Sequence, residues 1–419
     1  MKNLRIGICG VGNVGSALLT ILKENQSILL KQGNVMIEVL QVGARKGQEA
    51  IAYKDINVTK DLFEVASNPE IDVFVELIGG TDLAKELCLT ALSNGKHVVT
   101  ANKAMLAMHG DSLFKIASKK NLDIGFEASV AGGTPVIKAL REGLVANQVE
   151  WFAGILNGTS NFILSEMSES QTSFNNALKE AQKLGLAEAD PTLDIDGTDA
   201  AQKASILASL AFNVSNDFSK VSYEGIDKVE IEDLYYAEEL GYSVKHIAYG
   251  RILEGSASVS AFPTLVSNDH ILSQVSQQMN ALEIFSKGVG STVYYGPGAG
   301  PLPTASAVVA DLVDISKGRR LINVVNKTGK LKKDITQRFS RYFSFKAKNE
   351  PGVITKISSE FAKKSVSIEA LIQHESKKDQ VPLVILTGKI DDKKANSITK
   401  NLDSMKDVSS KVRQMRIHS

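Results

Sequence analysis

Five carboxylates and one lysine crowd into residues 188–203, which read EADPTLDIDGTDAAQK. The last acid, Asp199, stands four residues before Lys203 in an alanine-rich segment that predicts a helix over residues 199–212, so both side chains share one helix face. Carboxylates can bind an amino group, and a lysine fixed beside them can transfer a proton. The alternative is an acidic loop with an ordinary surface ion pair, which stabilises little.

Length and composition indicate a globular protein. The 419 residues suffice for roughly two or three domains, with 43% apolar and 23% charged residues. A net charge of +1 gives no electrostatic reason to expect nucleic acid or a membrane as partner. Two cysteines, no apolar run of membrane-spanning length and no signal-peptide cleavage site favour the cytoplasm. The six histidines show no metal-ligand spacing, and structural or surface roles are expected for them.

The first chemical motif is a glycine-rich turn between a predicted strand and a predicted helix. The apolar run 4–9 predicts a buried strand and residues 16–25 a helix. Between them lie Gly10, Val11, Gly12, Asn13, Val14 and Gly15. In this position the pattern G-x-G-x-x-G predicts a dinucleotide whose pyrophosphate sits at the helix N-terminus. A tight turn without a ligand is the alternative.

The second predicted strand, residues 35–42, bears on the choice of cofactor. An enzyme that uses NAD usually carries an acid at the end of this strand, to hold the ribose 2′-hydroxyl. Arg45 and Lys46 occupy that place here, and a basic pair suits a 2′-phosphate. The sequence therefore favours NADP, while NAD remains possible and a solvated basic turn is the alternative.

Further strand ends supply more candidates. The strand predicted over 72–79 ends at Gly79, and the strand over 96–101 is followed by Lys103. Ligands of open α/β sheets gather at the carboxyl ends of strands, which favours both positions. The segment 122–137 is rich in glycine and could offer carbonyls to a cation beside Glu127, or serve only as a hinge.

These motifs together resemble those of the homoserine dehydrogenase family. The resemblance covers roughly residues 1–330. Its motifs are GVGNVG (10–15), ELIGG (76–80), TANKA (100–104), FEASVAGGTP (126–135), LNGTSNFIL (156–164), GLAEADPTLDIDGTDAAQK (185–203) and GPGAGPLPTASAVVADL (296–312). The acid-to-lysine block and the GPGAG segment are specific to the family, whereas the glycine fingerprint is not.

The resemblance implies a role for each matching residue. Lys203 would transfer the proton, with Asp199 beside it at the substrate hydroxyl. Glu188 would hold the substrate amino group, Asp194 would line the pocket, and Lys103 would bind the substrate carboxylate or take part in catalysis. Gly185 and Gly300 would contact the cofactor. A monovalent cation, usually sodium, would lie by Glu127 and the carbonyls of Val130, Gly132 and Thr134. Asp190 and Asp196 are expected to shape or cap the loop.

The implied reaction is the reversible reduction of L-aspartate 4-semialdehyde to L-homoserine by NADPH, a step towards threonine, methionine and isoleucine. An ammonium group can stabilise the developing alkoxide and give it a proton. Oxidation needs the neutral amine, so we expect it to be fastest at alkaline pH. Another NADP-dependent dehydrogenase of a small amino or hydroxy acid, and a metabolite sensor without catalysis, remain alternatives.

The C-terminal residues 341–419 predict strands and helices in the order βαββαβ, which fits a ferredoxin-like module. The phrase NEPGVITKISSEFAKKSVSIEAL resembles an ACT domain, a small amino-acid-sensing module. The turn from Asn349 to Gly352 would then meet an effector, for which we expect threonine. A dimerisation module that binds nothing is the alternative.

The expected architecture is α/β with three domains. A Rossmann-type nucleotide-binding domain spans residues 1–135, with a return segment 301–325. A central α/β domain for catalysis and dimerisation spans residues 136–300. A linker over 326–340 leads to the ACT domain. The protein is expected to form a homodimer or a homotetramer.

Overall fold

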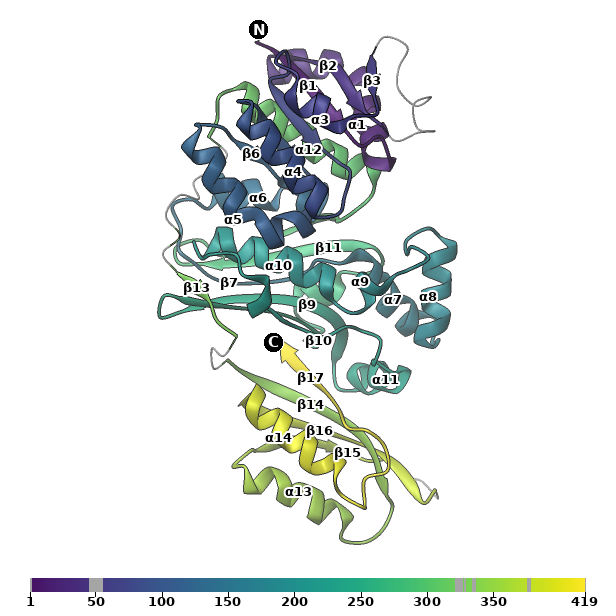
Figure 1. The fold of residues 1–419 in the computed structure, drawn as a ribbon. Helices are drawn as coiled ribbons and strands as arrows, with labels where there is room; N and C mark the ends of the chain where they lie inside the picture. Colours follow the sequence, from purple (N-terminus) through teal and green to yellow (C-terminus); the bar gives the residue numbers. More distant parts are fainter. Residues whose placement is uncertain are drawn as a thin grey trace.

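The computed structural model describes residues 2–44, 56–320, 327, 329–333, 337–374 and 378–418. Figure 1 shows three layers: the N-terminal domain in purple and blue, a central sheet with its helices in teal, and a C-terminal module in yellow-green. Arg45 and Lys46, the residues on which the preference for NADP depends, lie outside the described residues. Among the described helices, none is both long enough and apolar enough to cross a bilayer.

The N-terminal domain is built on a six-stranded sheet with the order β3-β2-β1-β4-β5-β6. Neighbouring strands are parallel throughout. The strands are β1 (Lys2–Cys9), β2 (Val35–Gly43), β3 (Asn57–Thr59), β4 (Val73–Glu76), β5 (His97–Thr100) and β6 (Ile124–Gly125). All four side chains of β4 are buried, as expected for a parallel strand covered on both faces. This sheet confirms the predicted Rossmann-type fold.

Helices cover this sheet: α1 (Asn13–Glu24), α2 (Gln26–Ile28), α3 (Leu62–Ser67), α4 (Asp82–Ser93), α5 (Lys103–Lys119) and α12 (Pro301–Ser316). The helix predicted from residue 16 begins at Asn13, because the glycine turn is shorter than expected. The strand predicted over 72–79 ends at Glu76, whose carboxylate accepts the backbone N–H groups of Ile78 and Gly79 and so turns the chain out of the sheet. Late in the chain, α12 packs against α1 and the same core.

The central layer is an antiparallel sheet with helices on one side. Its strands are β7 (Val149–Ile155), β9 (Tyr242–Leu253), β10 (Ser256–Ser267), β11 (Met279–Ser286) and β12 (Gly290–Pro297), with the short β8 (Ser222–Tyr223) at β10. The helices are α6 (Val136–Lys138), α7 (Gly158–Glu169), α8 (Phe174–Lys183), α9 (Thr192–Ile195), α10 (Thr198–Ala211) and α11 (Ile231–Glu239). Alanines make one side of α10 narrow enough to pack closely on β9, β10 and α5.

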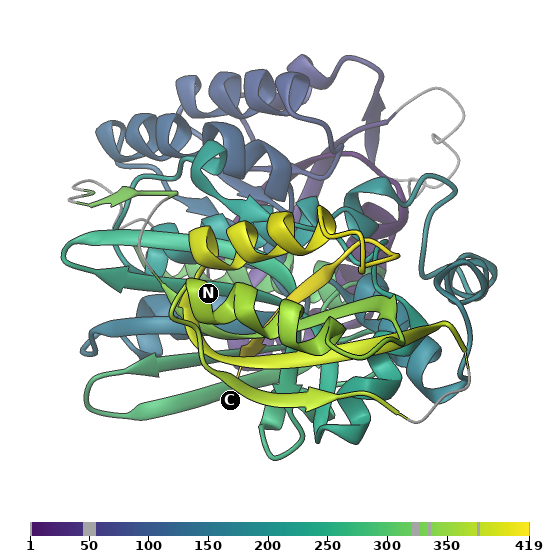
Figure 2. The same cartoon turned by 90° about the horizontal axis from the view of Figure 1, so that it is seen from below.

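The C-terminal module has the predicted βαββαβ order. Its elements are β14 (Arg338–Lys348), α13 (Val353–Lys363), β15 (Ile368–Ile372), β16 (Gln380–Asp391), α14 (Asp392–Asp403) and β17 (Arg413–His418). The sheet order is β17-β14-β16-β15, and α13 and α14 lie side by side over it (Figure 2). The first strand starts at Arg338, three residues before the predicted position, because Arg338 and Phe339 already pair with β16.

The C-terminal module continues the central sheet. Residues 416–418 of β17 pair in parallel with residues 264–266 of β10, so a single eleven-stranded sheet crosses from one domain to the next. The buried Arg416 strengthens this junction: it donates to Ser260 Oγ over 2.7 Å and to Asp392 Oδ2 over 2.9 Å, and its guanidinium lies 4.1 Å from the ring centre of Phe262. The segment predicted as a linker also contributes a short strand, β13 (Lys330–Leu331), to β10.

Candidate active site

The catalytic candidates meet where the N-terminal domain faces the central layer. Asp199 and Lys203 lie on the first turns of α10, and both are buried. The Nζ atom of Lys203 lies 2.7 Å from Asp199 Oδ2, while the Nζ atom of Lys103, at the start of α5, lies 2.9 Å from Asp199 Oδ1. One carboxylate therefore bridges two ammonium groups that come from different domains. Lys203 also donates to the carbonyl of Leu156 over 2.7 Å, which fixes the amine at the end of β7.

Asn157 links two of the acids, and the sequence reasoning did not single it out. Its Nδ2 donates to Asp194 Oδ1 over 2.7 Å and to Asp199 Oδ2 over 2.8 Å. Its Oδ1 accepts the backbone N–H of Ser160 and so caps the N-terminus of α7. Asparagine suits this place because a single amide can cap a helix and still hold two carboxylates. An Asn-Gly pair after an apolar strand was the available signal.

The charges of this cluster determine one another's protonation. Burial acts to raise the pKa of Asp199, but the ammonium groups of Lys203 and Lys103 outweigh it and hold that pKa well below its usual range. Attraction to Asp199 raises the pKa of Lys103 despite burial. Asp194 has no ion pair of this kind among the described residues, so burial and the nearby charge of Asp199 raise its pKa. The site thus keeps a fixed anion between cations, beside a carboxyl group that is easier to protonate.

The loop before α10 brings the remaining acids to the rim of the site. Glu188 is exposed, and its charge contributes to the raised pKa of Lys103 without a direct ion pair in the described part of the chain. Asp190 accepts hydrogen bonds from the backbone and the hydroxyl of Thr192, and Asp196 accepts the backbone N–H of Thr198. Asp190 and Asp196 therefore shape the loop, as expected from the sequence.

The glycine turn after β1 has the conformation that a dinucleotide site requires. A Cβ on Gly10, where φ is +99°, would lie 2.5 Å from the carbonyl oxygen of Leu77, and a Cβ on Gly15 would lie 2.1 Å from that of Gly10. Gly12 borders open space, and the turn leads into the N-terminus of α1 at Asn13, next to Val14. Val11 is buried beneath the turn. The N–H of Gly10 donates to the carbonyl of Gly43, so the N–H groups that could meet a phosphate group are those at the N-terminus of α1.

The loop after β4 lies next to this turn. Glu76, which is fully buried, accepts hydrogen bonds from Ile78 and Gly79 and from the hydroxyl of Thr100 over 2.6 Å. Burial raises the pKa of Glu76. Gly79 has a φ of +75° and open space at the position of a Cβ. Two glycines later in the chain were also predicted to contact the cofactor. Gly300 immediately precedes α12, and Gly185 follows α8 with a φ of +72°.

The segment proposed for a cation has oxygen atoms suited to a hard ion. In the structure, however, the carboxylate of Glu127 is used to hold the backbone that follows it. Both carboxylate oxygens of Glu127 accept backbone N–H groups, from Ile137 over 2.9 Å and from Lys138 over 2.8 Å. Burial raises the pKa of Glu127 to about 7. The hydroxyl of Thr134 is buried and has no hydrogen-bond partner among the described residues. Gly132, with a φ of +51°, packs directly against the backbone of Gly298.

The turn proposed for an effector lies in the C-terminal module, away from this cluster. Gly352 has a φ of +86° and precedes α13. The side chain of Asn349 donates to the carbonyl of Lys378 and accepts from Gln373, so it links the turn to the neighbouring strands β15 and β16.

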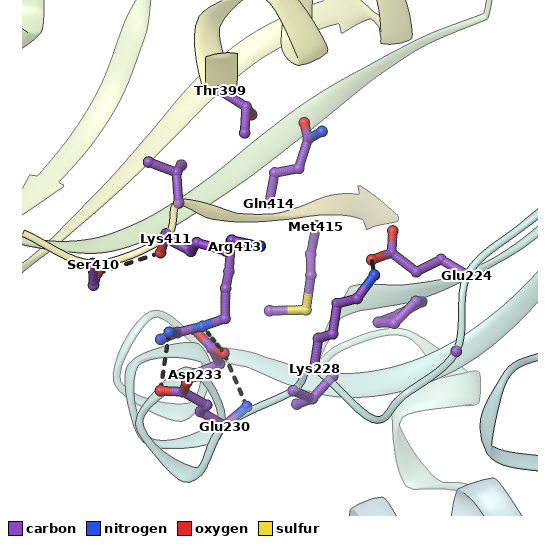
Figure 3. A pocket seen from close by; sticks show the side chains of 14 residues that line it. Glu224, Lys228, Glu230, Asp233, Thr399, Ser410, Lys411, Arg413, Gln414 and Met415 are labelled. Atoms are coloured by element: carbon purple, nitrogen blue, oxygen red, sulfur yellow. Dashed lines mark hydrogen bonds and ion pairs between the residues drawn. The ribbon is translucent and has the colours of Figure 1, made fainter. Parts of the chain in front are cut away.

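A cavity of about 470 Å³ lies between the C-terminal module and the central layer (Figure 3). Arg413 of β17 points towards α11, where its guanidinium lies 2.7 Å from Asp233 Oδ2 and 2.9 Å from Glu230 Oε2. Asp233 also accepts the hydroxyl of Tyr342. On the other wall, the carbonyl of Glu224 lies where a Cβ on Gly197, the residue before α10, would meet it. The cavity thus lies between the C-terminal module and the segment next to the start of α10.

Three side chains far apart in the sequence also meet, although no histidine spacing indicated it. Possible ligand atoms of His270, Glu283 and His418 lie within 4.8 Å of one another. His270 Nδ1 accepts the N–H of Leu272, so its Nε2 carries the proton and faces Glu283 Oε2 over 3.1 Å. This arrangement favours a hydrogen bond from neutral His270 to the Glu283 carboxylate over a metal ion.

Comparison with known proteins agrees with the three parts of the chain described above. Residues 10–127 match the family model "Homoserine dehydrogenase, NAD binding domain", residues 135–313 match "Homoserine dehydrogenase", and residues 341–403 match "ACT domain". The homoserine dehydrogenase of Pseudomonas aeruginosa is 43% identical over 430 residues, covering 100% of this chain and 99% of its own. That of Bacillus subtilis is 38% identical over 97% of this chain and 96% of its own.

Solved structures show the same likeness. The crystal structure of a homoserine dehydrogenase from Thiobacillus denitrificans superposes with a TM-score of 0.94 at 41% identity, covering 100% of this chain and 99% of that one. A hyperthermophilic archaeal homoserine dehydrogenase in complex with NADPH superposes with a TM-score of 0.64 at 29% identity, over 75% of this chain and 98% of that one.

Proposed function

The chain belongs to the homoserine dehydrogenase family, and we propose that it reduces L-aspartate 4-semialdehyde to L-homoserine, reversibly, with NADPH as the hydride donor. It is an NAD(P)-dependent oxidoreductase with an ACT domain. The observation that carries the proposed reaction is the bridge from Lys103 through Asp199 to Lys203, which joins the nucleotide-binding domain to the central layer.

In the reduction, the bound nicotinamide supplies a hydride to the aldehyde carbon. The Lys203 ammonium stabilises the negative charge that develops on the aldehyde oxygen and gives that oxygen a proton, which yields the alcohol. Asp199 and the carbonyl of Leu156 hold Lys203 in place, which keeps the geometry fixed as the charge develops. In the oxidation, neutral Lys203 would remove the hydroxyl proton while the hydride on the same carbon passes to the oxidised nicotinamide.

The substrate's own charges match the rest of the cluster. Its α-carboxylate would pair with Lys103, whose raised pKa keeps it cationic. Its α-ammonium would lie beside Glu188 at the rim and Asp194 beneath it. This assignment explains why both signs of charge surround Asp199, since a zwitterionic substrate needs a cation and an anion at a fixed separation.

The cofactor would lie along the glycine turn, with its pyrophosphate at the N-terminus of α1 and its nicotinamide end near Gly79 and Lys103. Gly185 and Gly300 would make later contacts. The archaeal relative in complex with NADPH supports a nicotinamide cofactor for this family. We favour NADP over NAD on the basic pair Arg45 and Lys46.

A monovalent cation, for which we propose sodium, would be held by Glu127 and by the carbonyls of Val130, Gly132 and Thr134. The buried, unpartnered hydroxyl of Thr134 and the buried carboxylate of Glu127 support a cation at this place. Such an ion would tie the exit of the nucleotide domain to the backbone near Gly298, and it would take no part in proton transfer.

We further propose that threonine inhibits the enzyme through the ACT domain at the turn of Asn349 and Gly352. The contact of Arg413 with Asp233 and the contact of Glu224 with Gly197 offer a route from the module to α10. Millimolar threonine should then slow homoserine oxidation, and Asn349→Ala should remove the inhibition. Unchanged kinetics of the unmodified protein in threonine would exclude this role.

A partly exposed aromatic face of the central sheet supports a homo-oligomer. Trp151 stacks on Phe285 with ring centres 5.4 Å apart, and Tyr295 of the neighbouring strand is 59% exposed. A dimer or a tetramer through this face would cover these rings. Light scattering after size exclusion would give the molecular mass, and a monomer would contradict the proposal.

Absorbance at 340 nm, with purified protein, homoserine and either NADP⁺ or NAD⁺, tests the proposed reaction. The absorbance should rise with homoserine, faster with NADP⁺, and fastest at alkaline pH. Malate, lactate and glutamate should give no rise; a rise with one of them would favour a dehydrogenase of another small acid. No rise with any substrate, in sodium or in potassium, would favour the metabolite sensor.

A further inference from the structure

A second polar cavity, of about 280 Å³, lies between α7, α11, β9 and the loop after β10. It shares no lining residue with the cluster around Asp199 or with the effector turn in the described part of the chain. Hydroxyl, amide and charged side chains line it, among them Ser165, Glu169, Glu238, Lys245, Asn268 and Ser276. Nothing in the proposed reaction uses this cavity.

Lys245 is the unusual residue of this cavity. It lies within β9 and is only 6% exposed. Its Nζ atom donates to the carbonyl of Val275 over 2.6 Å, and no other hydrogen-bond acceptor or ion-pair partner of Nζ occurs among the described residues. Asn161 also donates to that carbonyl, so Lys245 shares its partner. An ammonium group has three donors, and a buried one left incompletely paired is costly.

The protonation of Lys245 reflects this shortage of partners. Burial lowers its pKa to about 8, although the charge of Glu169 acts in the opposite direction. The same side chain would gain both a hydrogen bond and a counter-charge from a carboxylate placed in the cavity.

The other charges around the cavity restrict what it can hold. Glu169 and Glu238 both line it, so one cation faces two carboxylates. The carboxylates disfavour a simple anion, and Lys245 disfavours a simple cation. A small zwitterion satisfies both signs, and serine hydroxyls and the amide of Asn268 suit its polar atoms.

We propose that this cavity binds a free α-amino acid, separately from the active site and from the effector turn. The α-carboxylate pairs with Lys245, and the α-ammonium faces Glu169 and Glu238.

The position of the cavity connects it to two functional parts. Ser165 lies on α7 eight residues after Asn157, which corresponds to about 12 Å along the helix. Asn157 holds the catalytic acids, and Asn161 of the same helix shares the carbonyl of Val275 with Lys245. On the other side, α11 carries Asp233, the partner of Arg413. A ligand here would thus touch both the helix of the catalytic acids and the helix that docks the ACT domain.

The test is a thermal-melting screen of the full-length protein with each of the twenty standard L-amino acids at about 10 mM. Isothermal titration then gives the Kd of each amino acid that raises the melting temperature. The same titrations are made with Lys245→Met, which removes the charge but keeps the volume, and with Lys183→Met, a matched change at an exposed lysine of α8. Acetate and methylammonium serve as single-charge probes.

We expect at least one amino acid to bind with a Kd that Lys245→Met raises at least about tenfold, while Lys183→Met and Asn349→Ala leave it unchanged. Glu169→Gln combined with Glu238→Gln should also weaken it, and acetate should not replace it. If Lys245→Met does not fold, Ser168→Phe, which fills the cavity from its partly exposed side, takes its place. The proposal is overturned if no amino acid binds, or if every Kd is the same in the unmodified protein and the cavity variants.

Discussion

Two regions of this molecule bury several charges together: the cluster around Asp199 and the junction of β17 with α11. At the junction, Arg413 pairs with both Asp233 and Glu230, and Asp233 also accepts the hydroxyl of Tyr342, so each of these charged groups has a partner within the protein. At the cluster, Asp199 pairs with two cations, while Asp194 and Glu188 have no ion pair of their own among the described residues. A structural cluster is thus complete alone, whereas the active site leaves charges for a substrate to match.

The largest expected effect concerns the cluster around Asp199. Replacing Lys203 by alanine removes the proposed proton donor and should lower kcat by about 10²–10⁴-fold. Binding of NADP⁺, measured by titration calorimetry, should be unchanged because the glycine turn is untouched. Lys183→Ala, at an exposed lysine of α8, is the matched control and should retain full activity. A fall below tenfold would argue against Lys203 as the proton donor.

At the junction, the effect should appear in stability. Arg413→Met leaves the fully buried Asp233 without its cation and should lower the free energy of unfolding by about 3–5 kcal/mol, measured by urea denaturation. Removing the exposed partner of Glu224 by Lys228→Met should change it by less than about 1 kcal/mol. Equal effects of the two variants would contradict the structural role of Arg413.

A substitution of Asn157 can separate its two roles, the positioning of Asp194 and Asp199 and the capping of α7. Asn157→Ser keeps a hydroxyl that can cap α7 but lacks the amide that links Asp194 to Asp199. We expect kcat/KM for homoserine to fall about ten- to a hundredfold, the loss of a hydrogen bond to a charged group, with the melting temperature nearly unchanged. A large drop in melting temperature with normal activity would show that the cap is its main role.

The last expected effect concerns pH and lies where the end of β17 pairs with β10. Burial and the neighbouring His270 lower the pKa of His418 to about 4. The folded state therefore prefers the neutral ring, and its stability contribution is present above pH 6.5 and lost as the pH falls to about 4. A pKa difference of this size corresponds to a loss of at most about 3 kcal/mol. His418→Gln should flatten the fall of the unfolding free energy in this window; an unchanged profile would contradict the assignment.

Local sequence patterns predicted much of the site. The i,i+4 spacing placed Asp199 and Lys203 together, and the end of a parallel strand placed Lys103 at the edge of the sheet where ligands bind. Only the family resemblance placed Lys103 in the same site as Asp199 and Lys203. The glycine turn followed from its position between a strand and a helix. The order of elements in the C-terminal module followed from alternating and helical patterns.

Contacts between distant segments were beyond that reasoning. Asn157 reaches Asp199 only because β7 ends beside α10, and Arg413 reaches Asp233 only because β17 crosses to the central layer. Lys245 reads as an ordinary strand residue until β9 is buried between α7 and the loop after β10. No single-sequence pattern gives the register of a strand pair so far apart in the chain.

The pairing of β17 with β10 bears on how the ACT domain could be lost or replaced. Only three residues of each strand pair, but they cover part of an edge whose backbone groups would otherwise be open to another chain. A chain shortened before residue 413 would expose that edge next to apolar side chains and would be prone to self-association through it. A different domain joined to the central layer in place of this one would therefore need a strand of its own that pairs with this edge of β10.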